Sequence, residues 1–275
     1  MKLPGFIYFS LLLIFMSCKD DSHPPEDTTQ NKDDLFANTT IVDLSHDYSD
    51  ETVYWVTAKE FDLDTVAYGD TEGGYFYSAF NFSTAEHGGT HIDAPIHFAK
   101  NKQSVDEISL EKLMGSAIKI DVKARVGDNP DYQIAIDDFK NWEKEHDRQI
   151  PDGSIVLLET GFSTYYPDKL KYLGTDQRGE EALDKMHFPG LSPVAATWLV
   201  DNRNINAIGL DTPSIDYGQS KDFKSHVILL SHDIPAFENL TNLDQLPEIN
   251  FDIIALPIKI KGGSGGPLRI VGVLK

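Results

Sequence analysis

The segment of residues 87–97 constrains the fold more strongly than any other part of this 275-residue chain. It contains His87, His91, Asp93 and His97, at spacings of four, two and four. Several residues between them oppose an α-helix, namely Gly88, Gly89, Thr90, Ile92 and Pro95. In an extended chain every even spacing falls on one face, so we expect an extended segment from which all four side chains can converge.

This combination of side chains points to a metal ion. Imidazole and carboxylate groups suit zinc, manganese or iron, and a site built from so few ligands keeps a position open for water, as catalytic sites do. The segment lacks the glutamate of a helical His-Glu-x-x-His site, which excludes that class. The alternative interpretation is a set of core or surface histidines in a turn.

Written as His-x-Gly-Thr-His-x-Asp-x-Pro-x-His, the segment resembles the signature of the cyclase family of metal-dependent hydrolases, which includes bacterial kynurenine formamidase and isatin hydrolase. Blocks at residues 188–192, 209–216 and 238–243 are also similar to that family. The resemblance therefore covers most of residues 40–275. It implies that His87, His91 and Asp93 hold a first metal ion and that His97 is the proton donor and acceptor.

In family members with two metal ions, the aspartate bridges both, and a histidine and a glutamate twelve residues later complete the second site. His226 and Glu238 have this spacing. The resemblance thus implies one or two divalent ions per subunit, with zinc as the first expectation and manganese as the alternative. Without the family resemblance, we would interpret His226 as a histidine on a helix face and Glu238 as a surface glutamate.

Trp55 aligns with a tryptophan that lines the substrate pocket of formamidases, although the Pro-Gly-Asp usually found just after that tryptophan is absent here. An aromatic residue at a strand edge is otherwise a core residue. We therefore expect Trp55 to bind substrate, and we do not restrict the substrate to an aryl formamide.

The pattern after residue 40 predicts a single α/β domain over residues 40–275. The expected fold is cyclase-like, with a mixed β-sheet and flanking helices of the swivelling β/α/β type. Strands are expected at 41–44, 75–83, 155–158, 205–210, 251–260 and 268–274, and helices at 110–114 and 193–201, the latter capped by Ser192. The glycine-rich residues 261–267 read as a loop.

Residues 262–266, Gly-Gly-Ser-Gly-Gly, match the Gly-x-Ser-x-Gly pattern of serine hydrolases. A nucleophile elbow needs a helix after the serine, but Pro267 and a strand follow here. No histidine lies downstream to complete a catalytic triad. Ser264 is therefore not expected to be a nucleophile.

The charge balance excludes one class of partner. The chain has 24 Lys and Arg against 44 Asp and Glu, a net charge of −20, and no basic patch that would bind nucleic acid. The single cysteine, Cys18, also excludes a disulfide framework and a cysteine-rich zinc site.

The N-terminus has the pattern of a secretion signal. An apolar stretch at residues 6–16 is too short to span a bilayer and precedes Cys18. We expect a signal peptide at 1–17 and a lipidated Cys18 at the start of a disordered acidic tether, 18–39, because residues 15–18 resemble a loose lipobox. Residues 18–21 resemble the signal of surface lipoproteins, which implies the outer membrane or surface of a Gram-negative cell. The alternative is a cleaved signal with an incidental cysteine.

These observations together predict a hydrolase that cleaves the C–N bond of a small formamide, amide or lactam with metal-activated water. A lactonase or a polyketide-type cyclase is the alternative among enzymes, and a non-catalytic metal-binding or ligand-binding module is the alternative of another class. The family resemblance implies a homodimer or higher homo-oligomer. Membrane contact is expected only through the N-terminal lipid.

Overall fold

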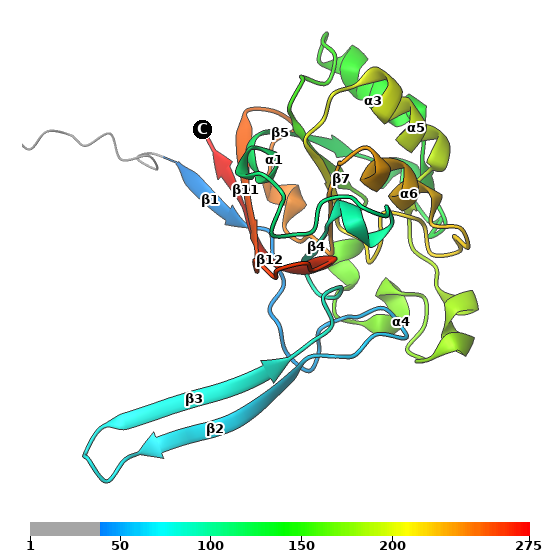
Figure 1. Ribbon diagram of the computed structural model, residues 1–275. Coiled ribbons are helices and arrows are strands. Elements are labelled where there is room, and N and C mark those ends of the chain that lie inside the picture. Colours follow the sequence, from blue (N-terminus) through cyan, green and yellow to red (C-terminus); the bar gives the residue numbers. More distant parts are fainter. Residues whose placement is uncertain (1–38) are drawn as a thin grey trace, which may run out of the picture. The chain divides into compact units, whose positions relative to one another are not determined.

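Seven strands close into a barrel at the centre of the structure, a computed structural model that describes residues 39–275 (Figure 1). Around the ring the order is β4, β12, β11, β5, β7, β9 and β10, and β10 pairs with β4 to close it. The strands from β5 through β7 and β9 to β10 are parallel, and the other pairs are antiparallel. Their bounds are His91–Asp93 (β4), Met114–Asp121 (β5), Ile155–Glu159 (β7), Ala207–Leu210 (β9), Ala236–Glu238 (β10), Phe251–Pro257 (β11) and Gly265–Leu274 (β12). An eighth strand, β1 (Thr40–Asp43), pairs with β12 outside the ring.

The expected swivelling β/α/β sheet with flanking helices is wrong, because the mixed sheet closes on itself. Closure depends on β12, which begins at Gly265 rather than at Leu268 and aligns Gly265 with Asp93 of β4. A Cβ atom at position 265 would lie 2.3 Å from the carbonyl oxygen of Ile92. Glycine is thus required at position 265, where the backbones of β12 and β4 meet. The end of the glycine-rich segment that the sequence predicted to be a loop therefore forms the start of a strand.

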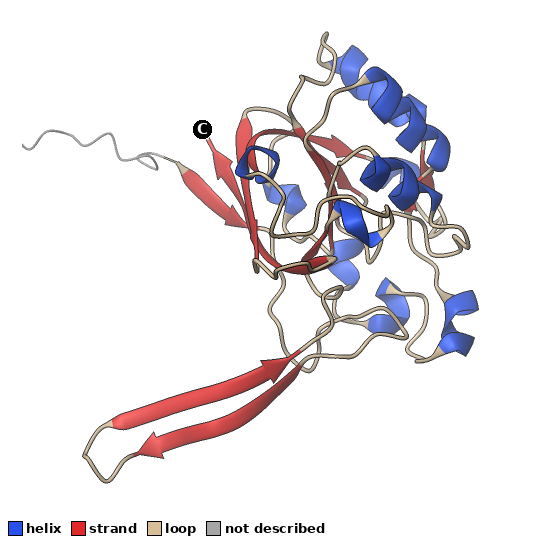
Figure 2. Cartoon of the chain, in the orientation of Figure 1, coloured by secondary structure: helices blue, strands red, loops and turns tan. Residues whose placement is uncertain are grey.

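Helices are few and short among the described residues (Figure 2). The α-helices are α1 (Leu110–Leu113), α2 (Lys123–Val126), α3 (Ile136–Glu145), α4 (Lys169–Tyr172), α5 (Pro193–Asn202) and α6 (Lys224–Ser231), and the 3-10 helices are Pro95–His97 (η1), Phe162–Tyr165 (η2), Glu180–Lys185 (η3) and Leu243–Gln245 (η4). Helices α3, α5 and α6 lie together on one side of the barrel. The predicted cap of α5 is confirmed, since the Ser192 side chain accepts a hydrogen bond from the Ala195 amide at 3.2 Å. None of the helices within residues 39–275 is long and apolar enough to cross a bilayer.

Two apolar cores lie on the two faces of the barrel wall. Along β7, Ile155 and Leu157 belong to the core inside the barrel, whereas Val156 and Leu158 belong to the core between the barrel and the helices. The four apolar residues of β7 are buried for this reason, and the fifth, Glu159, is buried against Lys119. The other elements predicted from local patterns are present with slightly shifted ends.

A separate two-stranded hairpin projects from the barrel (Figure 1). Its strands are β2 (Asp62–Asp70) and β3 (Phe76–Ser83), and a bulge interrupts their pairing between Thr65 and Ala67. A second small pair, β6 (Gln133–Ile134) with β8 (Gly190–Leu191), is parallel.

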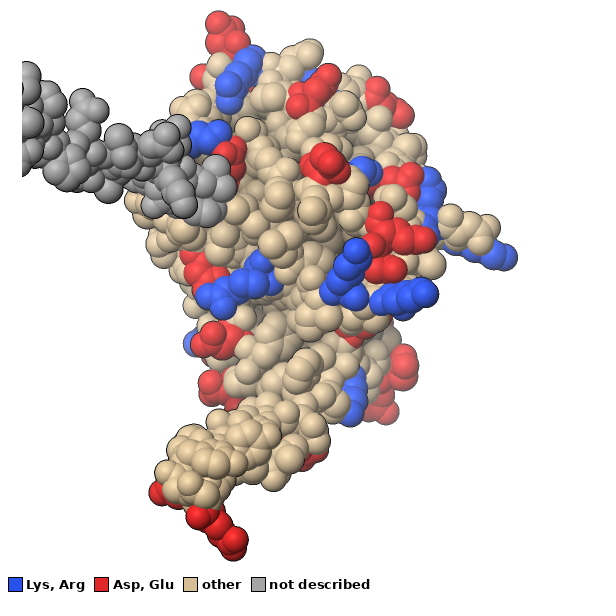
Figure 3. All heavy atoms as spheres, turned by 60° about the vertical axis from the view of Figure 1, so that its left-hand side comes forward, with Lys and Arg blue, Asp and Glu red and all other residues tan. Residues whose placement is uncertain are grey.

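One face of the hairpin is apolar and exposed. Leu63 pairs with Phe82, and Tyr68 contacts the rings of Phe76 and Phe80 at centroid distances of 5.3 and 6.2 Å. These five side chains, which we call the apolar hairpin face, are each 43–73% exposed. In the space-filling view the hairpin surface carries no lysine or arginine, and acidic residues gather at its tip (Figure 3).

The predictions for the N-terminus lie outside the described residues. These are the signal peptide at 1–17, the lipidated Cys18 and the tether as far as residue 38. They stay predictions.

We expect Gly265→Ala to destabilise the fold by about 2–3 kcal/mol, because the new methyl group has no room between β12 and β4. The control is Gly266→Ala, whose Cβ atom would be no closer than 3.3 Å to its nearest neighbour, the carbonyl oxygen of Ile258. Chemical denaturation of both variants measures the difference. Equal stability of the two would contradict the closure described here.

Candidate active site

The centre of the site lies on the outer face of two neighbouring strands. In the antiparallel pairing of β4 with β10, Glu238 is opposite His91, and Ala236 is opposite Asp93. Directly opposed residues share a face of the sheet, and so do residues two apart on one strand. Ile92, between the two site residues, packs into the barrel interior. The register alone therefore places His91, Asp93 and Glu238 together.

These three side chains are in contact and almost entirely buried. The Nε2 atom of His91 lies 3.3 Å from Asp93 Oδ1 and 3.3 Å from Glu238 Oε2. His91, Asp93 and Glu238 are 2%, 1% and 4% exposed. Two carboxylates removed from water require positive charge beside them, because desolvation of an unpaired anion costs several kcal/mol.

His87 and His97 reach the same place from either side of β4. His87 Nδ1 lies 2.7 Å from Asp93 Oδ1, and the rings of His87 and His97 stack with centroids 3.8 Å apart. His87 precedes the strand and His97 ends the 3-10 helix η1. The expectation of one extended segment is thus right only for His91 and Asp93, since β4 is three residues long and η1 begins two residues after it.

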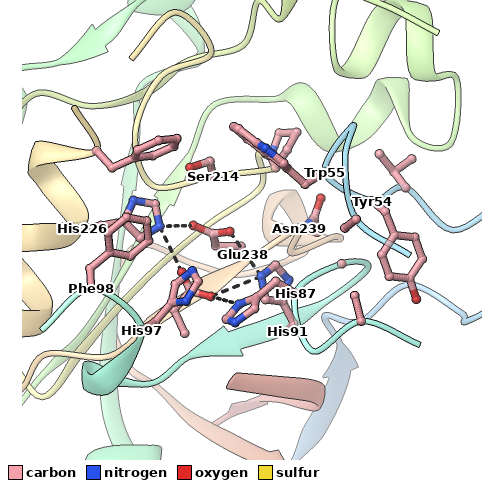
Figure 4. A pocket seen from close by; sticks show the side chains of 17 residues that line it. Tyr54, Trp55, His87, His91, His97, Phe98, Ser214, His226, Glu238 and Asn239 are labelled. Atoms are coloured by element: carbon pink, nitrogen blue, oxygen red, sulfur yellow. Dashed lines mark hydrogen bonds and ion pairs between the residues drawn. The ribbon is translucent and has the colours of Figure 1, made fainter. Parts of the chain in front are cut away.

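His226 approaches from α6, on the opposite side of the two carboxylates. Its Nε2 atom lies 3.0 Å from Asp93 Oδ2 and 3.2 Å from Glu238 Oε1. All six residues that the sequence singled out as metal ligands or proton carrier therefore meet around Asp93 (Figure 4). The two ligand sets that the family resemblance implies are not the groups whose possible ligand atoms lie within 4.8 Å of one another. One such group is His91, Asp93 and Glu238, and the other is His87, Asp93 and His97.

Outer hydrogen bonds orient the imidazoles. His91 Nδ1 donates to the carbonyl oxygen of Gly89 at 2.9 Å, and His226 Nδ1 donates to Asp216 Oδ2 at 2.6 Å. Each ring therefore turns its Nε2 lone pair toward the carboxylates. A lone pair facing a carboxylate oxygen is repulsive unless a proton or a cation lies between them. The donor set of imidazole nitrogens and carboxylate oxygens consequently fits a divalent metal ion.

The pKa shifts of these side chains have the same cause. Burial lowers the pKa of His91, but hydrogen bonds to Asp93 and Glu238 outweigh it and raise that pKa to about 10. Burial likewise lowers the pKa of His226, and Asp216, Asp93 and Glu238 raise it well above its usual value. Burial raises the pKa of Asp93, yet the surrounding histidines hold it well below its usual value. Protons on the imidazoles thus supply the positive charge that the carboxylates require.

Asp216 was not recognised as a site residue from the sequence. Its carboxylate accepts hydrogen bonds from His226 Nδ1 and from the backbone amides of Ser225 and His226, which lie in the first turn of α6. It therefore fixes both the ring and the helix that carries it. Its position in the family-like block at 209–216 was the only available signal, because no spacing rule connects it with His226.

An apolar cavity of about 280 Å³ opens above this cluster. Four aromatic residues line it together with the histidines of the cluster (Figure 4), namely Trp55, Tyr54, Phe98 and Phe223. Trp55 packs against Phe188 and Phe223 at centroid distances of 6.4 and 6.0 Å. The structure thus places Trp55 in the cavity wall, and its role in substrate binding stays a prediction.

Ser264, which lies in the Gly-x-Ser-x-Gly segment, lacks the helix that a nucleophile elbow requires after its serine. A strand follows it, and its Oγ atom lies 2.9 Å from His87 Nε2, on the side of the ring away from Asp93.

The barrel and the buried histidine and carboxylate cluster define a protein with a candidate centre for a divalent cation below an apolar pocket. The cyclase family model, described as "Putative cyclase", matches residues 42–217. The chain belongs to this family, as the sequence predicted.

Several named proteins are similar to this chain over most of its length. Isatin hydrolase from Roseibium aggregatum is 28% identical over 249 residues, which cover 87% of this chain and 89% of the relative. Kynurenine formamidase from Salinibacter ruber is 28% identical over 234 residues, which cover 84% of this chain and 96% of the relative. The solved structure of isatin hydrolase A from Ralstonia solanacearum aligns with a TM-score of 0.78 at 32% identity, covering 87% of this chain and 93% of that one.

We expect Asp216→Asn to weaken zinc binding about 10- to 100-fold, because the asparagine no longer forces His226 to keep its proton on Nδ1. Competition with a coloured chelator measures the dissociation constant. The control is Asp222→Asn, which removes an exposed carboxylate paired only with the exposed Lys224. An unchanged zinc affinity in Asp216→Asn would show that Asp216 does not orient His226.

Proposed function

We propose that this protein is a metal-dependent hydrolase that cleaves the C–N bond of a small formamide, amide or lactam. The observation that carries the proposal is the convergence of imidazole nitrogens on two buried carboxylates at the floor of an apolar pocket. The relatives named isatin hydrolase and kynurenine formamidase support it.

Five residues would hold the metal, namely His87, His91, Asp93, His226 and Glu238. Zinc is the proposed ion and manganese the alternative, with one or two ions per subunit, since both accept imidazole and carboxylate ligands. A bound divalent ion supplies Lewis acidity, which polarises a carbonyl group and lowers the pKa of a water molecule.

His97 is suited to carry the proton. Its ring makes no hydrogen bond to any described residue, and it lines the cavity. Burial is the largest influence on it and lowers its pKa to about 4, so the ring is neutral near pH 7. A ring nitrogen of His97 accepts a proton from the attacking water and returns it to the leaving nitrogen.

The cavity wall selects the substrate. Trp55, Phe98 and Phe223 present aromatic surfaces, and a volume of about 280 Å³ admits a molecule of one or two rings. A planar aromatic amide or lactam can stack on these side chains while its carbonyl group reaches the floor of the cavity.

We also propose that the protein assembles with a second copy of itself through the apolar hairpin face. A two-stranded hairpin is at best marginally stable alone in water. The five large side chains of this face would bury about 100 Å² each, or about 500 Å², a large part of the roughly 800 Å² that each partner contributes to a standard interface. The hairpin carries acidic residues and no lysine or arginine, which favours a second copy over an anionic lipid surface.

His97→Ala should keep the metal and lower kcat by about 100- to 10,000-fold, because only the proton carrier is removed. His91→Ala should lose both metal and activity, since its Nε2 atom contacts both carboxylates. Metal analysis and a hydrolysis panel of isatin, N-formylkynurenine and simple lactones provide the two measurements.

Full activity in His97→Ala would disprove this mechanism. A wild-type protein that retains zinc but hydrolyses no compound of the panel would instead favour a non-catalytic binding module. Preference for the lactones would indicate the lactonase alternative.

The double variant Phe76→Ser/Phe80→Ser should shift the protein from an oligomer to a monomer, because it removes two aromatic anchors from the apolar hairpin face. Light scattering coupled to size-exclusion chromatography measures the mass. Tyr77→Ser is the control, since Tyr77 is 51% exposed on the opposite face of the same strand. A monomeric wild type, or an oligomer unaffected by the double variant, would refute the proposed interface.

A further inference from the structure

The side chains of Glu86 and Ser264 form a chain of hydrogen bonds that ends on His87. Glu86 Oε2 lies 2.5 Å from Ser264 Oγ, and Ser264 Oγ lies 2.9 Å from His87 Nε2. The backbone amide of Ser264 also donates to Glu86 Oε2, at 3.1 Å. Glu86 comes from the segment before β4 and Ser264 from the residue before β12, so the chain connects the two strands that close the barrel.

The surrounding backbone is shaped around these contacts. A Cβ atom at Gly263 would lie 2.8 Å from Glu86 Oε1, and one at Gly265 would lie 2.5 Å from His87 Cε1. The carbonyl oxygen of Ser264 accepts a hydrogen bond from the Ala94 amide at 2.9 Å, which fixes the serine beside β4. Two glycines and a fixed backbone therefore hold the hydroxyl in place between Glu86 and His87.

The direction of each hydrogen bond follows from the chemistry of its partners. An ionised carboxylate only accepts, so the Ser264 hydroxyl must donate its single proton to Glu86. The serine oxygen is then left as an acceptor, and His87 Nε2 must donate to it. His87 Nδ1, 2.7 Å from Asp93 Oδ1, faces the centre of the site, and it would present its lone pair there when a metal ion takes the place of the proton between the two atoms.

We propose that Glu86 is a positioning residue that acts through Ser264 to keep the proton of His87 on Nε2 and its Nδ1 lone pair available to the metal. The inference rests on the proposed metal site. His87 would then resemble His91 and His226, whose outer nitrogens donate to Gly89 and Asp216, but with the roles of its two ring nitrogens exchanged. Ser264 is thus an intermediary between a carboxylate and a metal ligand.

Zinc affinity of the metal-stripped full-length protein tests this without reference to any substrate. We expect Ser264→Ala and Glu86→Ala each to weaken zinc binding about 10- to 100-fold, as removal of outer partners of metal ligands does. Glu86→Gln should stay close to wild type, because its amide oxygen can accept the same serine proton. Glu51→Ala, at an exposed carboxylate, is the neutral control.

The zinc affinity of the double variant Ser264→Ala/Glu86→Ala shows whether Glu86 acts through Ser264. If Glu86 acts only through Ser264, the double variant should bind zinc no more weakly than Ser264→Ala alone. Additive losses, or an unchanged affinity in Glu86→Ala, would overturn the proposal. Thermal unfolding of each variant verifies that it is folded. If Glu86→Ala is unstable, Glu86→Gln still tests the proposal, because a large loss of zinc affinity in the glutamine variant also counts against it. A wild type that binds zinc but hydrolyses nothing would refute the proposed function and leave this test intact.

Discussion

The pairing of β4 on both of its edges is the constraint on which the rest of the structure depends. β4 has only three residues, yet β10 lies on one side of it and β12 on the other. The first pairing brings Glu238 beside His91. The second brings the segment that contains Ser264 beside His87 and Asp93. Closing the barrel and assembling the candidate metal site are therefore the same structural event.

This arrangement has an energetic cost, because it buries two carboxylates and the histidines around them. Imidazolium groups offset part of that cost, as the raised pKa values of His91 and His226 indicate. A divalent cation would replace several protons at once and couple its binding free energy to the folded state. The cluster is thus a region where folding, proton binding and metal binding are linked.

The sequence predicted the local features and missed those that depend on distant contacts. His87, His91, Asp93 and His97 lie within one short segment, so their convergence required only local geometry. His226 and Glu238 came from the family resemblance, because their contact with Asp93 depends on strand pairing and on the placement of α6. Their metal-binding roles stay predictions.

Barrel closure could not be predicted for a similar reason. Gly265 pairs with Asp93 across a long stretch of sequence, and a glycine-rich segment carries no side-chain alternation from which a strand could be recognised. Ser264 illustrates the ambiguity. Its pattern resembles a nucleophile elbow and the composition around it reads as a loop, but in the structure it lies beside His87, a proposed metal ligand, just before a strand.

The cavity wall and the proposed metal ligands belong to the same segments of the chain. Phe98 follows His97 directly, Phe223 lies at the start of the helix that carries His226, and Tyr54 packs against Gly88, where a Cβ atom would lie 2.0 Å from the tyrosine ring. The same backbone segments consequently position the cavity wall and the candidate metal site, so a change at Gly88 would disturb both. The side chains of Trp55 and Phe223 make no hydrogen bond to any of the ligands among the described residues. Their replacement can therefore alter the shape of the pocket and leave the nitrogen and oxygen atoms of the candidate metal site in place, which is a physical route by which one barrel can present differently shaped pockets above the same cluster.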